Sequence, residues 1–198
     1  MPLGVFLGDV SRLRSILGSL EPLGVDHRYP IAELVCLRLF DSFENVVASI
    51  AYRLACGAKY LNGATPVVLK KVRTIDEARL QMLIHNRKRQ KSYLEWSKAT
   101  YIAESVEHVL EPSDHFTNYV RSNGVEIGRL RIVRNVIAHL NRSTKEDYST
   151  NILLPKYGSD RFLRPGRFLL SQRFGGNSPI LEFIDSMEIL VKGITRTI

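Results

Sequence analysis

Apolar residues recur at helical spacing through much of the chain, and this pattern predicts a mainly α-helical protein. The strongest stretch begins at Pro30 and predicts a long helix packed along one face. Its apolar positions are Ile31, Val35, Leu39, Phe43, Val46, Val47, Ile50 and Leu54. Proline suits the first turn of a helix, and Gly57 and Gly63 mark the expected end.

Three further helices are predicted in the middle of the chain, over residues 74–110, 112–124 and 125–140. Thr74 and Glu77 have the spacing of a capping box, in which a hydroxyl and a carboxylate oxygen accept from free backbone N–H groups. A last amphipathic helix should start at Ser178-Pro179. Together these elements predict an antiparallel helical bundle of four to six helices.

The two remaining stretches are less regular. Residues 1–29 predict a short helix near 10–20, within an N-terminal extension that packs on a helical domain of residues 30–198. Residues 150–178 are rich in glycine and proline, and they predict an irregular loop or short hairpin before the last helix.

Composition narrows the class of protein. The chain has 198 residues, which suits one compact domain, and its 44% hydrophobic and 24% charged residues are ordinary for a globular protein. No run of about 18 apolar residues occurs, so a membrane-spanning helix is not expected. The first residues lack a basic leader and a long apolar stretch, so we expect a cytoplasmic protein.

Neither a disulfide nor a metal site is predicted. Cys36 and Cys56 are 20 residues apart on one expected helix, or roughly 30 Å, which predicts two buried, reduced thiols. His27, His108 and His115 have no partner at a metal-ligand spacing.

The net charge of +8 favours a polyanionic partner such as nucleic acid, although it would also serve solubility alone. Two basic segments contain aromatic residues that could stack on bases. The first contains Arg87, Lys88 and Arg89, followed by Tyr93 and Trp96, and is either an RNA contact or a solvated helix face. The second alternates Arg161, Arg164, Arg167 and Arg173 with Phe162, Phe168 and Phe174, and either lines a groove or forms short strands with buried rings.

The segment 131–141 combines an apolar helix face with a polar stripe. At about 100° per residue, Leu130, Val133, Val136, Ile137 and Leu140 gather on one side. The other side carries, in angular order, Arg134, Ala138, Arg131, Asn135 and His139. Arg134 and His139 border the stripe, about 140° and about 7.5 Å apart along the helix, so a substrate would lie across it.

The order Arg134-Asn135-Val136-Ile137-Ala138-His139 resembles the signature of the HEPN family. In that signature an arginine is followed by a polar residue, often asparagine, and then by a histidine near a helix end after four to six residues. A long helix with acidic residues, here Asp41 and Glu44, precedes it by about ninety residues. The resemblance covers residues 30–145 and the last helix; residues 1–29 and 150–178 have no clear counterpart.

The resemblance implies a metal-independent endoribonuclease that needs no cofactor and leaves 2′,3′-cyclic phosphate and 5′-OH ends. It implies a homodimer whose protomers each give one motif to a shared cleft. It also implies a toxin or defence setting, in which an antitoxin of the nucleotidyltransferase type can hold the enzyme inactive.

Each residue type suits its expected role. His139 would act as general acid/base, because imidazoles exchange protons near neutral pH. Arg134 would stabilise the growing charge on the phosphate, and Asn135 would position it. Glu44 or Asp41 would hold Arg134 or His139 in place. Arg131 and Arg142 would contact the RNA backbone.

Other interpretations stay open. Arg79 and His85 also fit the bare spacing, but apolar Leu80 follows Arg79, whereas Asn135 follows Arg134. A histidine in a last helical turn also interacts favourably with the helix dipole, and arginines often simply face solvent. The alternative functions are a non-catalytic module that binds RNA, a nucleotide or a protein, and a basic DNA-binding helical protein.

Overall fold

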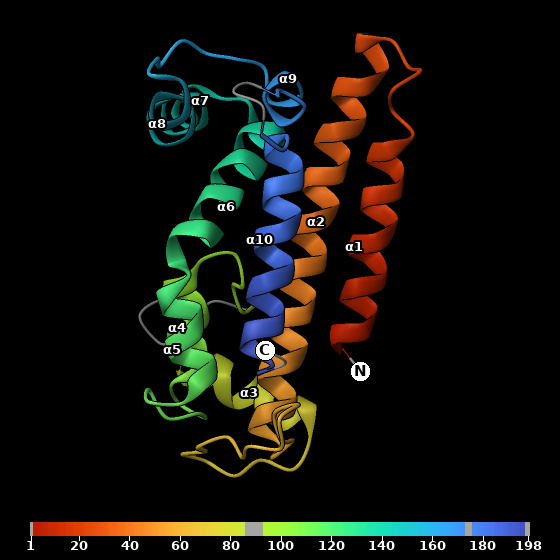
Figure 1. Cartoon of the computed structure of the whole chain (residues 1–198). Coiled ribbons are helices and arrows are strands. Elements are labelled where there is room, and N and C mark those ends of the chain that lie inside the picture. The colour runs from red at the N-terminus through yellow and green to blue at the C-terminus, as the bar shows by residue number, and fades with distance from the viewer. Residues whose placement is uncertain (1, 86–92, 173–175, 197–198) are drawn as a thin grey trace. The chain divides into compact units, whose positions relative to one another are not determined.

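The protein is mainly helical (Figure 1). The computed structural model describes residues 2–85, 93–172 and 176–196. Its helices are α1 (Pro2–Gly18), α2 (Val25–Ala55), α3 (Ile75–His85), α4 (Ala99–Val106), α5 (His115–Ser122), α6 (Gly124–His139), α7 (Arg142–Tyr148), a π-helical turn η1 (Ser149–Leu153), α8 (Leu154–Tyr157), α9 (Pro165–Leu169) and α10 (Pro179–Ile194). Over those ranges the only β pairing is an isolated bridge between Val68 and Leu110.

The chain divides into two compact units. Unit 1 comprises residues 1–4, 43–127 and 189–198, and unit 2 comprises residues 5–42 and 128–188. Helices α1, α2, α6 and α10 contribute residues to both units. None of the described helices is long and apolar enough to cross a membrane.

Unit 1 contains a buried carboxylate, Asp114, which caps α5. It accepts hydrogen bonds from the backbone N–H groups of Phe116 and Val67, each at 2.9 Å, and from the hydroxyl of Tyr60. Burial, and then the Asp114 carboxylate, raise the pKa of Tyr60. A buried charge is costly unless it is hydrogen-bonded, so this network fixes the loop before α5.

Unit 2 contains the polar stripe of α6 and is joined by polar contacts between helices. Arg14 of α1 pairs with Asp185 and Glu188 of α10, each at 2.6 Å. Ser42 of α2 donates to Asp9 of α1 at 2.8 Å. These bonds orient helices whose apolar sides are already buried.

The short helix α9 approaches α2 closely. The backbone N–H of Gly166 donates to the Glu33 carboxylate at 2.8 Å. A Cβ at position 166 would lie 2.5 Å from the carbonyl oxygen of Tyr29, so only glycine fits without a shift.

Several predicted elements are confirmed. The helix predicted over 125–140 is α6, the one predicted to start at Ser178-Pro179 is α10, and α5 lies within 112–124. The capping box forms in part: the Glu77 N–H donates to Thr74 Oγ1 at 3.1 Å, while the Glu77 carboxylate accepts from the N–H of Arg73, one residue earlier than expected.

Two helix boundaries were predicted wrongly. The long helix α2 begins at Val25, not Pro30, because the N–H groups of His27 and Arg28 already bond to the Gly24 carbonyl. The predicted boundary between the N-terminal extension and the helical domain, after residue 29, therefore lies inside α2. Helix α1 runs over Pro2–Gly18 rather than 10–20, since Gly4 and Gly8 are accommodated within it.

The helix predicted over 74–110 is interrupted. Helix α3 ends at His85, and α4 begins only at Ala99. Between them, Trp96 is buried in a non-helical segment with its ring edge-on to Tyr52 at 5.5 Å. The sequence pattern could not predict this interruption, because a single buried aromatic residue outside a helix adds no periodicity to the sequence.

The described part of the stretch predicted as irregular, 150–178, is about half helical, and it contains no hairpin. It contains the end of η1 followed by α8 and α9. Its prolines start short helices, since Pro155 and Pro165 each lie in a first turn, and Gly158 ends α8 at a φ of +67°. In this segment the prolines therefore mark where helices begin, and Gly158 marks where one ends.

The cysteines are both free, but only one is buried. Cys36 lies in the core of unit 2, where burial, and then Glu33, raise its thiol pKa to about 12. Cys56 is half-buried just beyond the end of α2, so the prediction of two buried thiols is wrong for this residue.

The close approach at Gly166 is testable. We expect Gly166→Ala to lower the free energy of unfolding by about 1–3 kcal/mol, because the new methyl group must displace the backbone of Tyr29. Gly128→Ala, within α6, is the control: a Cβ there meets nothing within 4 Å, so stability should rise by up to about 1 kcal/mol. Equal effects in urea denaturation would contradict this packing.

Candidate functional site at the end of α6

The last turns of α6 have the two faces expected from the sequence. Leu130, Val133 and Val136 are fully buried in unit 2. On the other side Arg131, Arg134 and Asn135 are half-buried, and Ala138 and His139 are exposed. The polar stripe is therefore accessible along its length.

The helix stops at His139 through a sharp change in the backbone. The N–H of Leu140 still bonds to the carbonyl of Val136 at 3.1 Å, but Leu140 has a φ of +21°, which L-residues other than glycine seldom adopt. Asn141 then caps α7, its side chain accepting from the N–H of Thr144 at 2.9 Å. Leu140, expected on the buried face, is 53% exposed because it lies beyond the helix end.

The same break leaves His139 at an exposed junction of two helices. Within the described residues its imidazole has no hydrogen bond or ion pair. A ligand could therefore approach either ring nitrogen.

Arg134 is supported by two neighbours. Its guanidinium lies over the ring of Phe40, 5.6 Å from the centroid, and Nη1 donates to Asn135 Oδ1 at 3.3 Å. A cation at this distance is attracted to the face of an aromatic ring. The hydrogen bond is long and therefore weak. Phe40 is thus the stronger support, and guanidinium N–H groups remain available for an anion.

The acidic residues expected to assist are not equivalent. Asp41 is exposed, and in the described part of the chain it is not bonded to Arg134 or His139. Glu44 is half-buried in unit 1, whereas the stripe belongs to unit 2, so its supporting role stays a prediction.

Only some of the residues expected to contact RNA lie at the surface of the described part of the chain. Arg131 is half-buried on the stripe, and Arg142 is exposed and pairs with Glu146 at 2.8 Å. Arg87, Lys88 and Arg89 lie outside the described residues. Of the aromatics that follow them, Tyr93 is exposed but Trp96 is buried, so Trp96 is not a surface for stacking.

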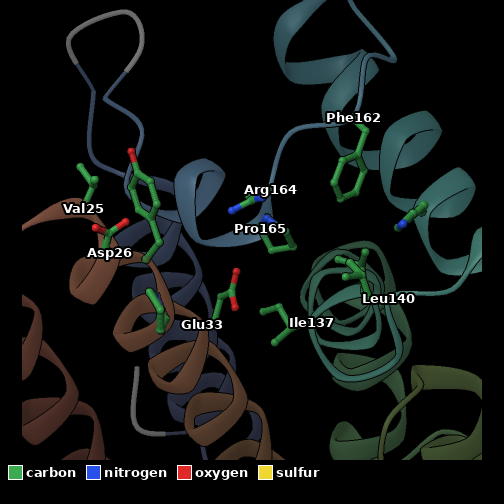
Figure 2. A pocket seen from close by; sticks show the side chains of 12 residues that line it. Val25, Asp26, Glu33, Ile137, Leu140, Phe162, Arg164 and Pro165 are labelled. Carbon is green, nitrogen blue, oxygen red and sulfur yellow. The ribbon is translucent and has the colours of Figure 1, made fainter.

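A pocket of about 540 Å³ lies in unit 2 beside the same end of α6 (Figure 2). Val136, Ile137 and Leu140 form its α6 side. Its polar and aromatic lining comes from Asp26, Tyr29 and Glu33 of α2 and from Lys145, Phe162 and Arg164. Figure 2 shows Glu33 below Arg164 and Pro165, with Ile137 and Leu140 to its right and Phe162 at the upper right.

Sequence reasoning missed most of these neighbours. The sequence analysis named Asp41 as a supporting residue but not its neighbour Phe40, whose ring contacts the Arg134 guanidinium. Phe162 and Arg164 belong to the alternating arginine and phenylalanine segment, where lining a groove was one of two interpretations. The other, short strands with buried rings, is wrong for Phe162, which is 40% exposed outside any strand.

Comparisons with known proteins identify no family: no protein-family model matches the chain, and no curated protein or solved structure is significantly similar to it. The side chains at the end of α6 are therefore the basis for assigning a function.

Removal of the helix cap at Asn141 should lower the stability of the protein measurably. We expect Asn141→Ala to lower the free energy of unfolding by about 1 kcal/mol, because the N–H of Thr144 loses its acceptor. Asn141→Ser should retain most of the stability. Asn151→Ala, which removes only an exposed bond to Asp147, should change it by less than about 0.5 kcal/mol in the same thermal denaturation measurements.

Proposed function

We propose that the chain is a metal-independent endoribonuclease of the HEPN type, with its active site at the end of α6. The observation that carries the proposal is that an unbonded, exposed imidazole and a ring-supported guanidinium share one polar stripe. Both groups suit metal-independent phosphodiester cleavage, and both remain open to a ligand.

The chemistry uses the RNA's own nucleophile. The ribose 2′-OH attacks phosphorus as a base takes its proton, the bond from phosphorus to the 5′-oxygen breaks, and the leaving oxygen takes up a proton. The fragments end in a 2′,3′-cyclic phosphate and a 5′-OH. His139 serves in these proton transfers, and Arg134 donates to the phosphate oxygens as their charge grows.

Asn135 positions Arg134 through its side-chain oxygen, and Arg131 and Arg142 supply positive charge for neighbouring phosphates. One group takes a proton and another returns one, and a second copy of the motif would supply the second group. The proposal therefore includes a homodimer with a shared cleft. From the resemblance to the HEPN family it also includes a helical-bundle fold of the HEPN type, a cytoplasmic location and control by a nucleotidyltransferase-type antitoxin.

A second function is favoured by one observation. Among the described residues none holds the imidazole of His139 in a fixed orientation. Catalytic histidines are commonly oriented by a hydrogen-bonded partner. A module that binds RNA, a nucleotide or a protein without cleaving would need no such partner.

Substitution of the two central residues separates these functions. We expect His139→Ala to reduce the rate of RNA cleavage by about 100- to 10,000-fold, since a general acid/base is lost. Arg134→Ala should reduce it by about 100- to 1,000-fold, through lost charge stabilisation. Cleavage of a labelled RNA by the purified chain in EDTA measures both.

Arg79→Ala is the control, because Arg79 also lies on a helix and also precedes a histidine at the family spacing. Its cleavage rate should equal that of the wild type. Folded variants of His139 and Arg134 with full activity would refute the proposed site.

The ring beneath Arg134 gives an independent expectation. Phe40→Leu keeps an apolar side chain but removes the aromatic face, so cleavage should fall by about 2- to 30-fold. Phe6→Leu makes the same substitution at another buried position of unit 2 and should leave the cleavage rate unchanged. Similar activity losses in both variants, at matched thermal stability, would mean that Phe40 acts only through packing.

A further inference from the structure

The lining of the pocket beside α6 includes charged side chains, which a purely apolar ligand would not need. It contains two carboxylates, Asp26 and Glu33, and two cations, Lys145 and Arg164. Aromatic and aliphatic side chains fill the space between them. The ligand that matches this lining is flat, largely apolar on its faces and rich in hydrogen-bonding groups at its edges. A nucleobase has this character.

The aromatic surface is held in place and remains accessible. The Phe162 ring is 40% exposed, and it packs edge-on against the buried ring of Tyr148 at a centroid distance of 6.1 Å. Lys145 lies over the Phe162 ring, 5.5 Å from the centroid. A base that stacks on this ring would meet a surface that is already ordered.

The carboxylates distinguish among the four bases. Guanine presents two neighbouring donors, N1–H and the N2 amino group, which one carboxylate can accept together. Adenine and cytosine present one amino group next to an acceptor nitrogen, and uracil presents one N–H between two acceptors. On its other edge guanine has O6 and N7, the pair to which arginine donates most often in specific base contacts.

Glu33 is suited to reading the donor edge. The backbone N–H of Gly166 donates to its Oε1 at 2.8 Å, which fixes the carboxylate while leaving lone pairs free. Arg164 immediately precedes Pro165 and Gly166, so the same local structure that holds Glu33 also positions a cation above it in the pocket lining (Figure 2).

The pocket lies on the apolar face of α6 and the proposed site on its polar face, but both are at the same end of the helix. Leu140 in its wall directly follows His139, and Val136 and Ile137 lie one turn earlier on α6. We propose that this pocket binds a guanine base of the RNA, with Phe162 stacking on it, Glu33 accepting from N1–H and N2, and Arg164 donating to O6 and N7. The assignment of that base to the substrate rests on the proposed ribonuclease function.

Binding of mononucleotides tests the pocket without depending on cleavage. The four nucleoside 3′-monophosphates are titrated into the full chain by calorimetry, with wild-type and His139→Ala protein in parallel. We expect guanosine 3′-monophosphate to bind at least about fivefold more tightly than the other three, in both proteins. Equal affinities for all four, or no saturable binding, would overturn the inference.

Pocket variants locate the binding. Phe162→Ala should weaken binding of guanosine 3′-monophosphate by at least about fivefold. Glu33→Gln can still accept from Gly166, but it should abolish the preference for guanine. Asp160→Asn and Arg161→Gln, exposed positions in the same loop that are not part of the pocket lining, are the controls. A guanine preference that survives both pocket variants would place the ligand elsewhere and refute the assignment.

The two proposals can fail separately. Guanine-selective binding by a chain that does not cleave RNA would retain the pocket and refute the ribonuclease. Cleavage without guanine-selective binding would retain the ribonuclease and refute the pocket.

Discussion

The end of α6 at His139 is the constraint on which the proposed site depends. One face of the helix is fixed by the burial of Leu130, Val133 and Val136, so the opposite face must point outward. The positive φ of Leu140 and the cap at Asn141 then stop the helix and turn the chain. Were the helix to continue, His139 would lie within a regular turn and lose its place at an exposed junction.

The surroundings of this helix end are built by segments distant in sequence. Phe40 of α2 supports Arg134, and Glu33 of the same helix holds the N–H of Gly166 at the start of α9. The substrate groups that we propose, a phosphate over the stripe and a base in the pocket, would thus meet side chains ordered by one stretch of α2. This common support is the physical link between the two proposals.

Helices with a regular apolar period could be predicted from the sequence, as α6 and α10 show, and so could the polar stripe of α6. Features set by tertiary contacts could not. The start of α2 depends on the Gly24 carbonyl, and the support of Arg134 depends on a ring about ninety residues away. The segment after Tyr148 was misread because its prolines begin helices, while its glycine at 158 ends one. Whether Glu44 assists the stripe stays a prediction.

The most direct measurement is the chemistry of the RNA ends that the purified chain produces in EDTA. If the RNA's own 2′-OH is the nucleophile, every new 3′ end carries a 2′,3′-cyclic phosphate, and every new 5′ end is a free hydroxyl that polynucleotide kinase can label directly. New 5′-phosphate ends, or cutting that chelation abolishes, would contradict the mechanism assigned to Arg134 and His139.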